Sequence, residues 1–200
     1  MPTNCLALVE HAGMDRFEET LLSSVLHHPG GMMLLAGTLK VEHSELITPE
    51  LVNSALEVLA RHFAFVVVDL GVGLTETALN VLERAHRILV VVTTAPPAIK
   101  DTVEVLGLFR NVLGIPDGNV SVVLNHPRPG SKVRRADVER MLSRPVDWEI
   151  GFDGSRMERA SASGQILVLS ERSSPISRAA RDIATSLLTP IASAPTRPGH

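Results

Sequence analysis

Two polar residues close apolar runs of the sequence, and their types suit them to chemistry. Asp69 follows the run AFVVV at 64–68, and Asn125 follows VSVVL at 120–124. A carboxylate at the end of an apolar strand is costly to bury unpaired, so Asp69 should face a crevice and hold a cation, a water or a backbone donor. Asn125 offers an amide donor and acceptor suited to the edge of a purine. The plainer alternatives are that Asp69 caps the glycine loop after it and that Asn125 is an ordinary turn residue.

The glycine pair Gly71 and Gly73 resembles the start of a dinucleotide-binding fingerprint. The third glycine of that pattern would fall at Glu76, which would crowd and repel a pyrophosphate. The next apolar run ends in Thr93 rather than in an acidic residue. The glycines therefore favour a tight turn before a helix capped by Thr75.

A basic segment, RPGSKVRR, covers residues 128–135 and contains Arg128, Lys132, Arg134 and Arg135. It could meet phosphate or an acidic partner, although a solvated loop leading into a helix is commoner. The whole chain has a net charge of −3 and only 3% aromatic residues. The nearly balanced charge and the scarcity of aromatic residues both argue against nucleic acid as the partner.

Other chemistries find little support in the 200 residues. The histidines show no metal-ligand spacing, and G-x-S-x-G does not occur. The single cysteine, Cys5, excludes an intrachain disulfide and fits a small packing residue. No apolar run approaches the roughly 18 residues of a membrane span, and the first residues do not resemble a signal peptide. We expect a soluble, cytoplasmic protein.

The elements that must position these residues alternate between two periodicities. The runs at 64–68, 88–92 and 120–124 are β-branched and predict strands buried on both faces; 32–35 and 146–150 are weaker candidates. Helical spacing predicts helices over 15–27, 49–61, 75–85, 99–113, 136–142 and 174–188, the second with Thr48 as N-cap. The serine-rich stretches 161–163 and 170–174 are interpreted as loops.

This alternation predicts an α/β fold of three layers, with a mostly parallel sheet flanked by helices. We expect one domain over 1–188. The Pro-, Ala-, Ser- and Thr-rich residues 189–200 predict a disordered tail.

The run from FAFVVVDLGVGLTETALNVLERAHRILVVVTT to VSVVLNHPRPGS resembles the MinD/ParA-type P-loop ATPases. Within them it is most similar to the CpaE/TadZ branch, which is tied to pilus assembly and polar positioning. The pieces LLSSVLHHPGGMMLLAGTLKVEHSELITPELVNSALEVLARH and PVDWEIGFDGSRMERASASGQILV fit the same branch. The similarity extends from about residue 4 to 188 and rests on the order of these segments rather than on one diagnostic motif.

The resemblance implies ATP and Mg²⁺ as ligands and assigns roles to single positions. Asp69 matches the aspartate that holds a magnesium-bound water, and Gly73 matches the glycine of the family's D-x-P-x-G switch. Asn125 matches the asparagine that contacts adenine. The loop Gly151-Phe152-Asp153 matches the one beside the base.

The sequence also departs from the family pattern. Its lysines are Lys40, Lys100 and Lys132, none of which follows a glycine, so the 200 residues contain no G-K-[ST] phosphate loop. The family's first strand and its second strand, with its acidic end, also have no counterpart. Gly71 stands in place of the switch proline, and Gly151 in place of the proline of the base loop. Because phosphoryl transfer depends on positioning and electrostatics, we expect no ATP hydrolysis by this chain alone.

The same departures create a problem for the sheet. In the family's strand order, the strand ending at Asp69 lies between the two strands that have no counterpart, and an apolar strand at a bare edge invites aggregation. We expect the sheet to close up, with 32–35 and 88–92 on either side of 64–68 and a dimer contact; the alternative is that another chain covers the gap.

Three functions are consistent with these residues and with the resemblance. The first is a non-hydrolytic interaction or positioning protein. The second is an ATPase, or a fragment of one, whose phosphate loop comes from another chain or from upstream sequence. The third and weakest is a DNA-binding partitioning protein.

Overall fold

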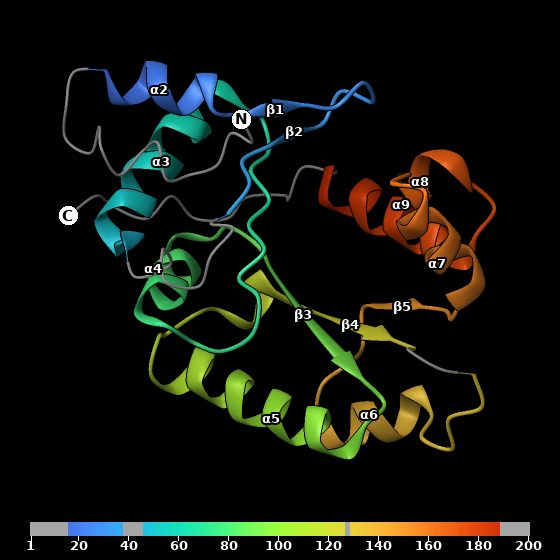
Figure 1. The fold of residues 1–200 in the computed structure, drawn as a ribbon. Coiled ribbons are helices and arrows are strands. Elements are labelled where there is room, and N and C mark those ends of the chain that lie inside the picture. Colours follow the sequence, from blue (N-terminus) through green and yellow to red (C-terminus); the bar gives the residue numbers. More distant parts are fainter. Residues whose placement is uncertain (1–15, 38–45, 127–128, 189–200) are drawn as a thin grey trace. The chain divides into compact units, whose positions relative to one another are not determined.

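A computed structural model describes residues 16–37, 46–126 and 129–188 (Figure 1). Its residues fall into two compact units, divided after Ala85. The predicted tail at 189–200, Cys5 and Arg128 lie outside the described residues. The prediction of one domain over 1–188 stays a prediction.

Unit 1 is built around two helices, α2 (Phe17–Ser23) and α3 (Pro49–His62). Their apolar faces form one buried cluster of Phe17, Leu21, Leu51, Ala55 and Val58. Thr48 caps α3 as predicted, because its Oγ1 accepts the Leu51 N–H at 3.2 Å.

Two neighbouring side chains at the end of α3, Arg61 and His62, hold α2 at its surface. Arg61 Nη2 lies 2.6 Å from Glu18 Oε2, and His62 Nε2 lies 2.7 Å from Glu18 Oε1. The hydrogen bond from His62, and after it the one from Arg61, holds the pKa of Glu18 below its ordinary value.

Between these helices in the sequence, unit 1 contains a short antiparallel hairpin of β1 (Leu26–His27) and β2 (Met33–Leu34). The prediction of a helix over 15–27 is therefore wrong at its end. The helix stops at Ser23 and the chain turns through Pro29 and Gly31, whose φ of +85° suits glycine.

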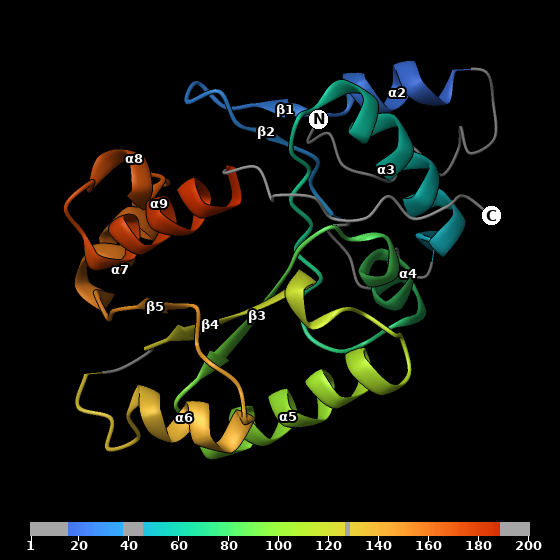
Figure 2. The ribbon, with the colours of Figure 1, turned by 180° about the vertical axis from the view of Figure 1, so that it is seen from behind.

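Unit 2 has the predicted α/β architecture. Its sheet has the order β3-β4-β5, from β3 (Ile88–Thr93), β4 (Val120–Asn125) and β5 (Trp148–Ile150), and both ladders are parallel. The crossover helices are α5 (Pro96–Asn111) and α6 (Arg135–Leu142). Figures 1 and 2 show these two on one side of the sheet and α9 (Pro175–Leu188) on the other.

The core of unit 2 lies between the sheet and its crossover helices. It consists of Val92, Ile99, Val122, Leu124, Val138, Leu142 and Val146. The runs at 88–92 and 120–124 were predicted correctly as strands, and β-branched residues supply most of their packing. Burial on both faces was predicted correctly only for 120–124, because Leu89 and Val91 on one face of β3 are 38% and 59% exposed.

The serine-rich segment at 161–163 is not simply a loop. Helix α7 (Gly154–Ala162) runs into it, and the short α8 (Leu167–Ser170) ends at the next serine-rich segment. Ser163 Oγ donates to the Arg159 carbonyl at 2.8 Å. This local bond lets a serine finish a helix, which composition alone does not reveal.

The clearest failure of the sequence prediction is the segment 64–68, which forms no strand. Its side chains are exposed, with Phe65 at 61% and Val67 at 94%. The expected neighbours pair elsewhere: β2 with β1, and β3 with β4. The expectation that the sheet closes up around 64–68 is thus wrong. A strand is held by its neighbours' backbone groups, and no described strand supplies them here.

Candidate functional site

In unit 1, the residues predicted to do chemistry form a turn between 64–68 and α4 (Glu76–Arg84). Asp69 Oδ1 accepts the Gly71 N–H at 3.0 Å, so the carboxylate caps the glycine loop. Gly71 and Gly73 have φ of +65° and +95°. A proline cannot take such a φ, so this turn differs from one that a switch proline would impose.

The turn leads directly into α4, which Thr75 caps. Thr75 Oγ1 accepts the Ala78 N–H at 3.2 Å, and Ala78 and Leu82 are buried. The simpler interpretation of the two glycines, a tight turn before a capped helix, describes this geometry. The Asp69 side chain lies at the surface, where its second carboxylate oxygen can meet solvent or a ligand.

In unit 2, the other predicted site residues lie at the carboxyl ends of the strands. Asn125 is the register partner of Ile150, so Asn125 and the loop from Gly151 to Asp153 lie at the same edge of the sheet. Ligands of open α/β sheets bind at this edge. The Asn125 carboxamide forms no hydrogen bond with another described residue, which leaves it available to a ligand.

The loop after β5 is packed closely around its glycines. A Cβ on Gly151 would stand 3.2 Å from the Pro175 Cβ, and a Cβ on Gly154 would stand 2.6 Å from the Phe152 ring. Asp153 Oδ2 accepts from Arg156 Nη1 at 2.8 Å. That bond, and a weaker one from Ser174, hold the pKa of Asp153 below its ordinary value. The carboxylate is therefore already engaged in the fold.

Within the basic segment, Arg135 is held by bonds of the fold, whereas Lys132 and Arg134 can contact a partner. Arg135 Nε pairs with Glu139 Oε1 at 3.0 Å, and its guanidinium also donates to the Val146 carbonyl. Arg135 thus ties α6 to the stretch of chain that precedes β5. Lys132 and Arg134 are exposed, and their side chains form no hydrogen bond within the described part of the chain.

A cavity of about 380 Å³ opens beside this segment. Its lining includes His126, Arg134, Glu149 and Phe152. It brings the beginning of α6 and the ends of β4 and β5 together in one place, a combination that the sequence did not point to.

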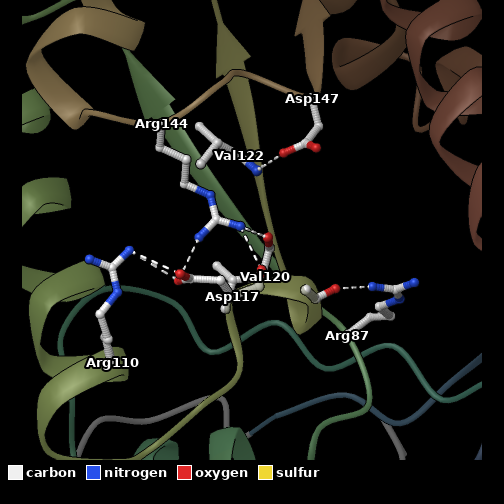
Figure 3. Close-up of polar contacts among 8 residues, drawn as sticks. Arg87, Arg110, Asp117, Val120, Val122, Arg144 and Asp147 are labelled. Atoms are coloured by element: carbon white, nitrogen blue, oxygen red, sulfur yellow. Dashed lines mark hydrogen bonds and ion pairs between the residues drawn. The ribbon is translucent and has the colours of Figure 1, made fainter. Parts of the chain in front are cut away.

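A second polar cluster, which sequence reasoning missed, lies at the opposite end of the strands (Figure 3). Arg144 donates to the Asp117 carbonyl at 2.7 Å and to the Val120 carbonyl, while its Nη1 pairs with Asp117 Oδ1 at 3.3 Å. Arg110 pairs with the same carboxylate at 3.1 Å. Asp117 begins the 3-10 turn Asp117–Asn119 that leads into β4.

Two further bonds complete the cluster. Arg87 donates to the Gly118 carbonyl, and Asp147 Oδ2 accepts the Val122 N–H at 2.7 Å. The arginines hold the amino end of β4 through its backbone carbonyls, and Asp147 ties the residue before β5 to β4. The cluster lies away from the ligand edge of the sheet. Its members are scattered along the sequence with no shared spacing, so no sequence signal could have found it.

Comparisons with known proteins agree with this fold. No family model matches the chain. It is 29% identical over 109 residues to the septum site-determining protein MinD of Thermotoga maritima, covering 52% of this chain and 40% of that protein. It is 28% identical over 131 residues to a putative MinD of Emiliania huxleyi, covering 63% and 47%. The chain thus matches less than half the length of these curated relatives.

Solved structures give the same result at lower identity. A ParA family ATPase from Chlorobium tepidum has a TM-score of 0.81 and 22% identity, covering 92% of this chain and 75% of that one. The cell division ATPase MinD of Pyrococcus furiosus has a TM-score of 0.67 and 17% identity, covering 91% and 79%.

The parallel sheet, its flanking helices and these matches define an α/β fold like that of the ParA and MinD structures. Within that class the chain is a distant relative of the MinD/ParA ATPases. No helix among the described residues is long and apolar enough to cross a membrane.

Proposed function

We propose that this chain is a non-hydrolytic relative of the MinD/ParA ATPases that works as a protein-interaction or positioning factor. The observation that carries the proposal is the segment 64–68, an uncharged apolar run ending at Asp69 whose side chains are exposed. Exposed apolar surface of this kind is typical of protein contacts. A protein partner or a second copy of the chain is the ligand that fits it.

The polar groups of the candidate site support the proposal that the chain does not hydrolyse ATP. Asp69 caps its own turn and Asp153 is paired with Arg156. The 200 residues contain no G-K-[ST], so they supply neither a phosphate-loop lysine nor a glycine-rich cradle for phosphates. In unit 2, Asn125 and Gly151 are the residues that the resemblance assigns to the base of a nucleotide. In unit 1, Asp69 is the residue that it assigns to Mg²⁺, through water.

The resemblance to one branch of the family makes the proposed partner more specific. The segments around 64–94 and 120–131 favour the CpaE/TadZ branch, so the partner would belong to a cytoplasmic pilus-assembly or polar-positioning system. Capture of such a component by the purified chain, lost on charge substitution within 64–68, would support this assignment.

An ATPase assay tests the proposal directly. The pure chain with ATP and Mg²⁺ should release phosphate no faster than its Asp69→Asn variant, which keeps the turn but removes the carboxylate charge. A rate clearly above that of the variant would show that the chain hydrolyses ATP and would refute the proposal.

The second candidate is an ATPase whose phosphate loop comes from another chain or from upstream sequence. It is favoured by the same segment, because 64–68 ends at Asp69 and has no described strand beside it. An in-frame upstream stretch encoding G-K-[ST] would decide for it. DNA binding through Lys132 and Arg134 is the third candidate, and it predicts an affinity that falls steeply with salt.

A further inference from the structure

A second cavity of unit 2, of about 360 Å³, opens at the amino ends of β4 and β5, away from the ligand edge of the sheet. Its lining includes two opposite charges, Arg87 and Asp147, and two apolar side chains, Trp148 and Leu187. A concave site that combines a few polar groups with apolar surface is the usual form of a small-molecule site. The proposed function does not use this cavity.

The other charged residues of the lining pair with each other. In the described part of the chain these are Asp117 and Arg144, whose Oδ1 and Nη1 lie 3.3 Å apart. By contrast, neither Arg87 nor Asp147 forms an ion pair with another described residue. The cavity therefore presents one positive and one negative group for which the described fold supplies no counter-charge.

Local hydrogen bonds hold both groups in place and leave part of each available (Figure 3). The Asp147 backbone N–H donates to the Val122 carbonyl at 2.9 Å, and Asp147 Oδ2 accepts the Val122 N–H at 2.7 Å. The Oδ1 atom of the same carboxylate is left for a ligand. Arg87 Nη1 donates to the Gly118 carbonyl, which leaves the donors on Nε and Nη2. Groups that are held in advance lose little conformational entropy when a ligand binds.

We propose that this cavity binds a free α-amino acid with an apolar side chain. Arg87 donates to the carboxylate of the ligand, and Asp147 Oδ1 accepts from its ammonium group. The apolar side chain of the ligand packs against Trp148 and Leu187. A ligand with only a negative charge would face Asp147 uncompensated, and one with only a positive charge would face Arg87, so a zwitterion matches the lining best.

Fluorescence of Trp148 tests the site, because this residue lines the cavity and is the only tryptophan of the chain. Leucine should produce a saturable change at about millimolar concentrations, since Arg87 and Asp147 are exposed and water competes for them. Leucinamide lacks the carboxylate, and N-acetylleucine lacks the ammonium group. Each should bind about tenfold more weakly than leucine, because one charge-assisted hydrogen bond is lost.

Two variants assign the two contacts. Arg87→Gln should bind leucine and leucinamide equally. Asp147→Asn keeps an oxygen for the Val122 N–H and should bind leucine and N-acetylleucine equally. The matched control is Arg110→Gln, which changes a partner of Asp117 that does not line the cavity, and it should keep the wild-type preference for leucine.

The absence of a saturable change with leucine would overturn the proposal. Equal binding of leucine and its two derivatives by the wild-type chain would overturn it as well. Neither result bears on ATP hydrolysis or on the segment 64–68, so this site and the proposed function fail separately.

Discussion

At the residue scale, Asp69 is the position where two interpretations compete most directly. Its Oδ1 accepts the Gly71 N–H at 3.0 Å, which is a structural use of a carboxylate that the family resemblance assigns to a magnesium-bound water. An exposed carboxylate whose second oxygen lies at the surface can cap the turn and also hold a magnesium-bound water. The local bond explains why the residue type is suited to this turn without any ligand.

Two substitutions of Asp69 distinguish the effect of its hydrogen bond in the turn from the effect of its charge. Asp69→Ala should lower the free energy of unfolding by about 0.5–1 kcal/mol, because the Gly71 N–H loses its acceptor. Asp69→Asn keeps an acceptor and should unfold close to the wild-type midpoint. Urea denaturation measures both, and equal losses in the two variants would argue against the hydrogen bond.

At the element scale, Arg144 determines how the amino end of β4 is held. Its side chain is 15% exposed and donates to the carbonyls of Asp117 and Val120. Arg144→Ala should destabilise unit 2 by about 2 kcal/mol, since partly buried carbonyls lose a charged donor.

The control for Arg144 is Arg140→Ala, which breaks the exposed pair with Asp137. Exposed pairs contribute little, so its loss should stay below about 0.5 kcal/mol. Thermal unfolding followed at Trp148 would compare the two. A control as damaging as Arg144→Ala would show that the cluster has no special role.

The contact between α6 and the chain before β5 predicts a pH dependence. The Val146 N–H, and after it Arg135, hold the pKa of Glu139 below its ordinary value of 4.5. A carboxyl whose pKa is lower in the folded state stabilises the fold above that ordinary value, and the contribution is lost as the pH falls.

The unfolding midpoint should therefore be steady above about pH 5 and fall below about pH 4.5. Asp137, Asp153 and Glu18 are shifted in the same direction and add to the fall. Glu139→Gln should make the fall shallower, which a series of thermal scans from neutral to strongly acidic pH would reveal. An unchanged slope would contradict the role given to Glu139.

Sequence patterns were most reliable where an element has its neighbours within the chain. The runs at 88–92 and 120–124 became β3 and β4, and Thr48 and Thr75 cap their helices as predicted. The segment 64–68 has the same composition but no described partner strand, so propensity alone could not form it. The cluster around Arg144 depends on the fold, because its residues meet only after the sheet has formed.

At the scale of the whole molecule, the exposed segment 64–68 makes a prediction about Val67. Its side chain is 94% exposed, so Val67→Lys should change the free energy of unfolding by less than about 0.5 kcal/mol. The charge should also reduce binding of a hydrophobic dye and of any protein partner. A loss of several kcal/mol would instead show that Val67 is buried in the working form of the protein.

At the same scale, we propose that these residues share the fold of the ParA and MinD structures but lack the groups that hold a nucleotide's phosphates. The most direct test is a calorimetric titration of the purified chain with ATP and Mg²⁺, with its mass measured in the same buffer. We expect no detectable heat of binding. Micromolar binding would contradict the claim and would mean that other groups hold the phosphates, most simply those of a second chain.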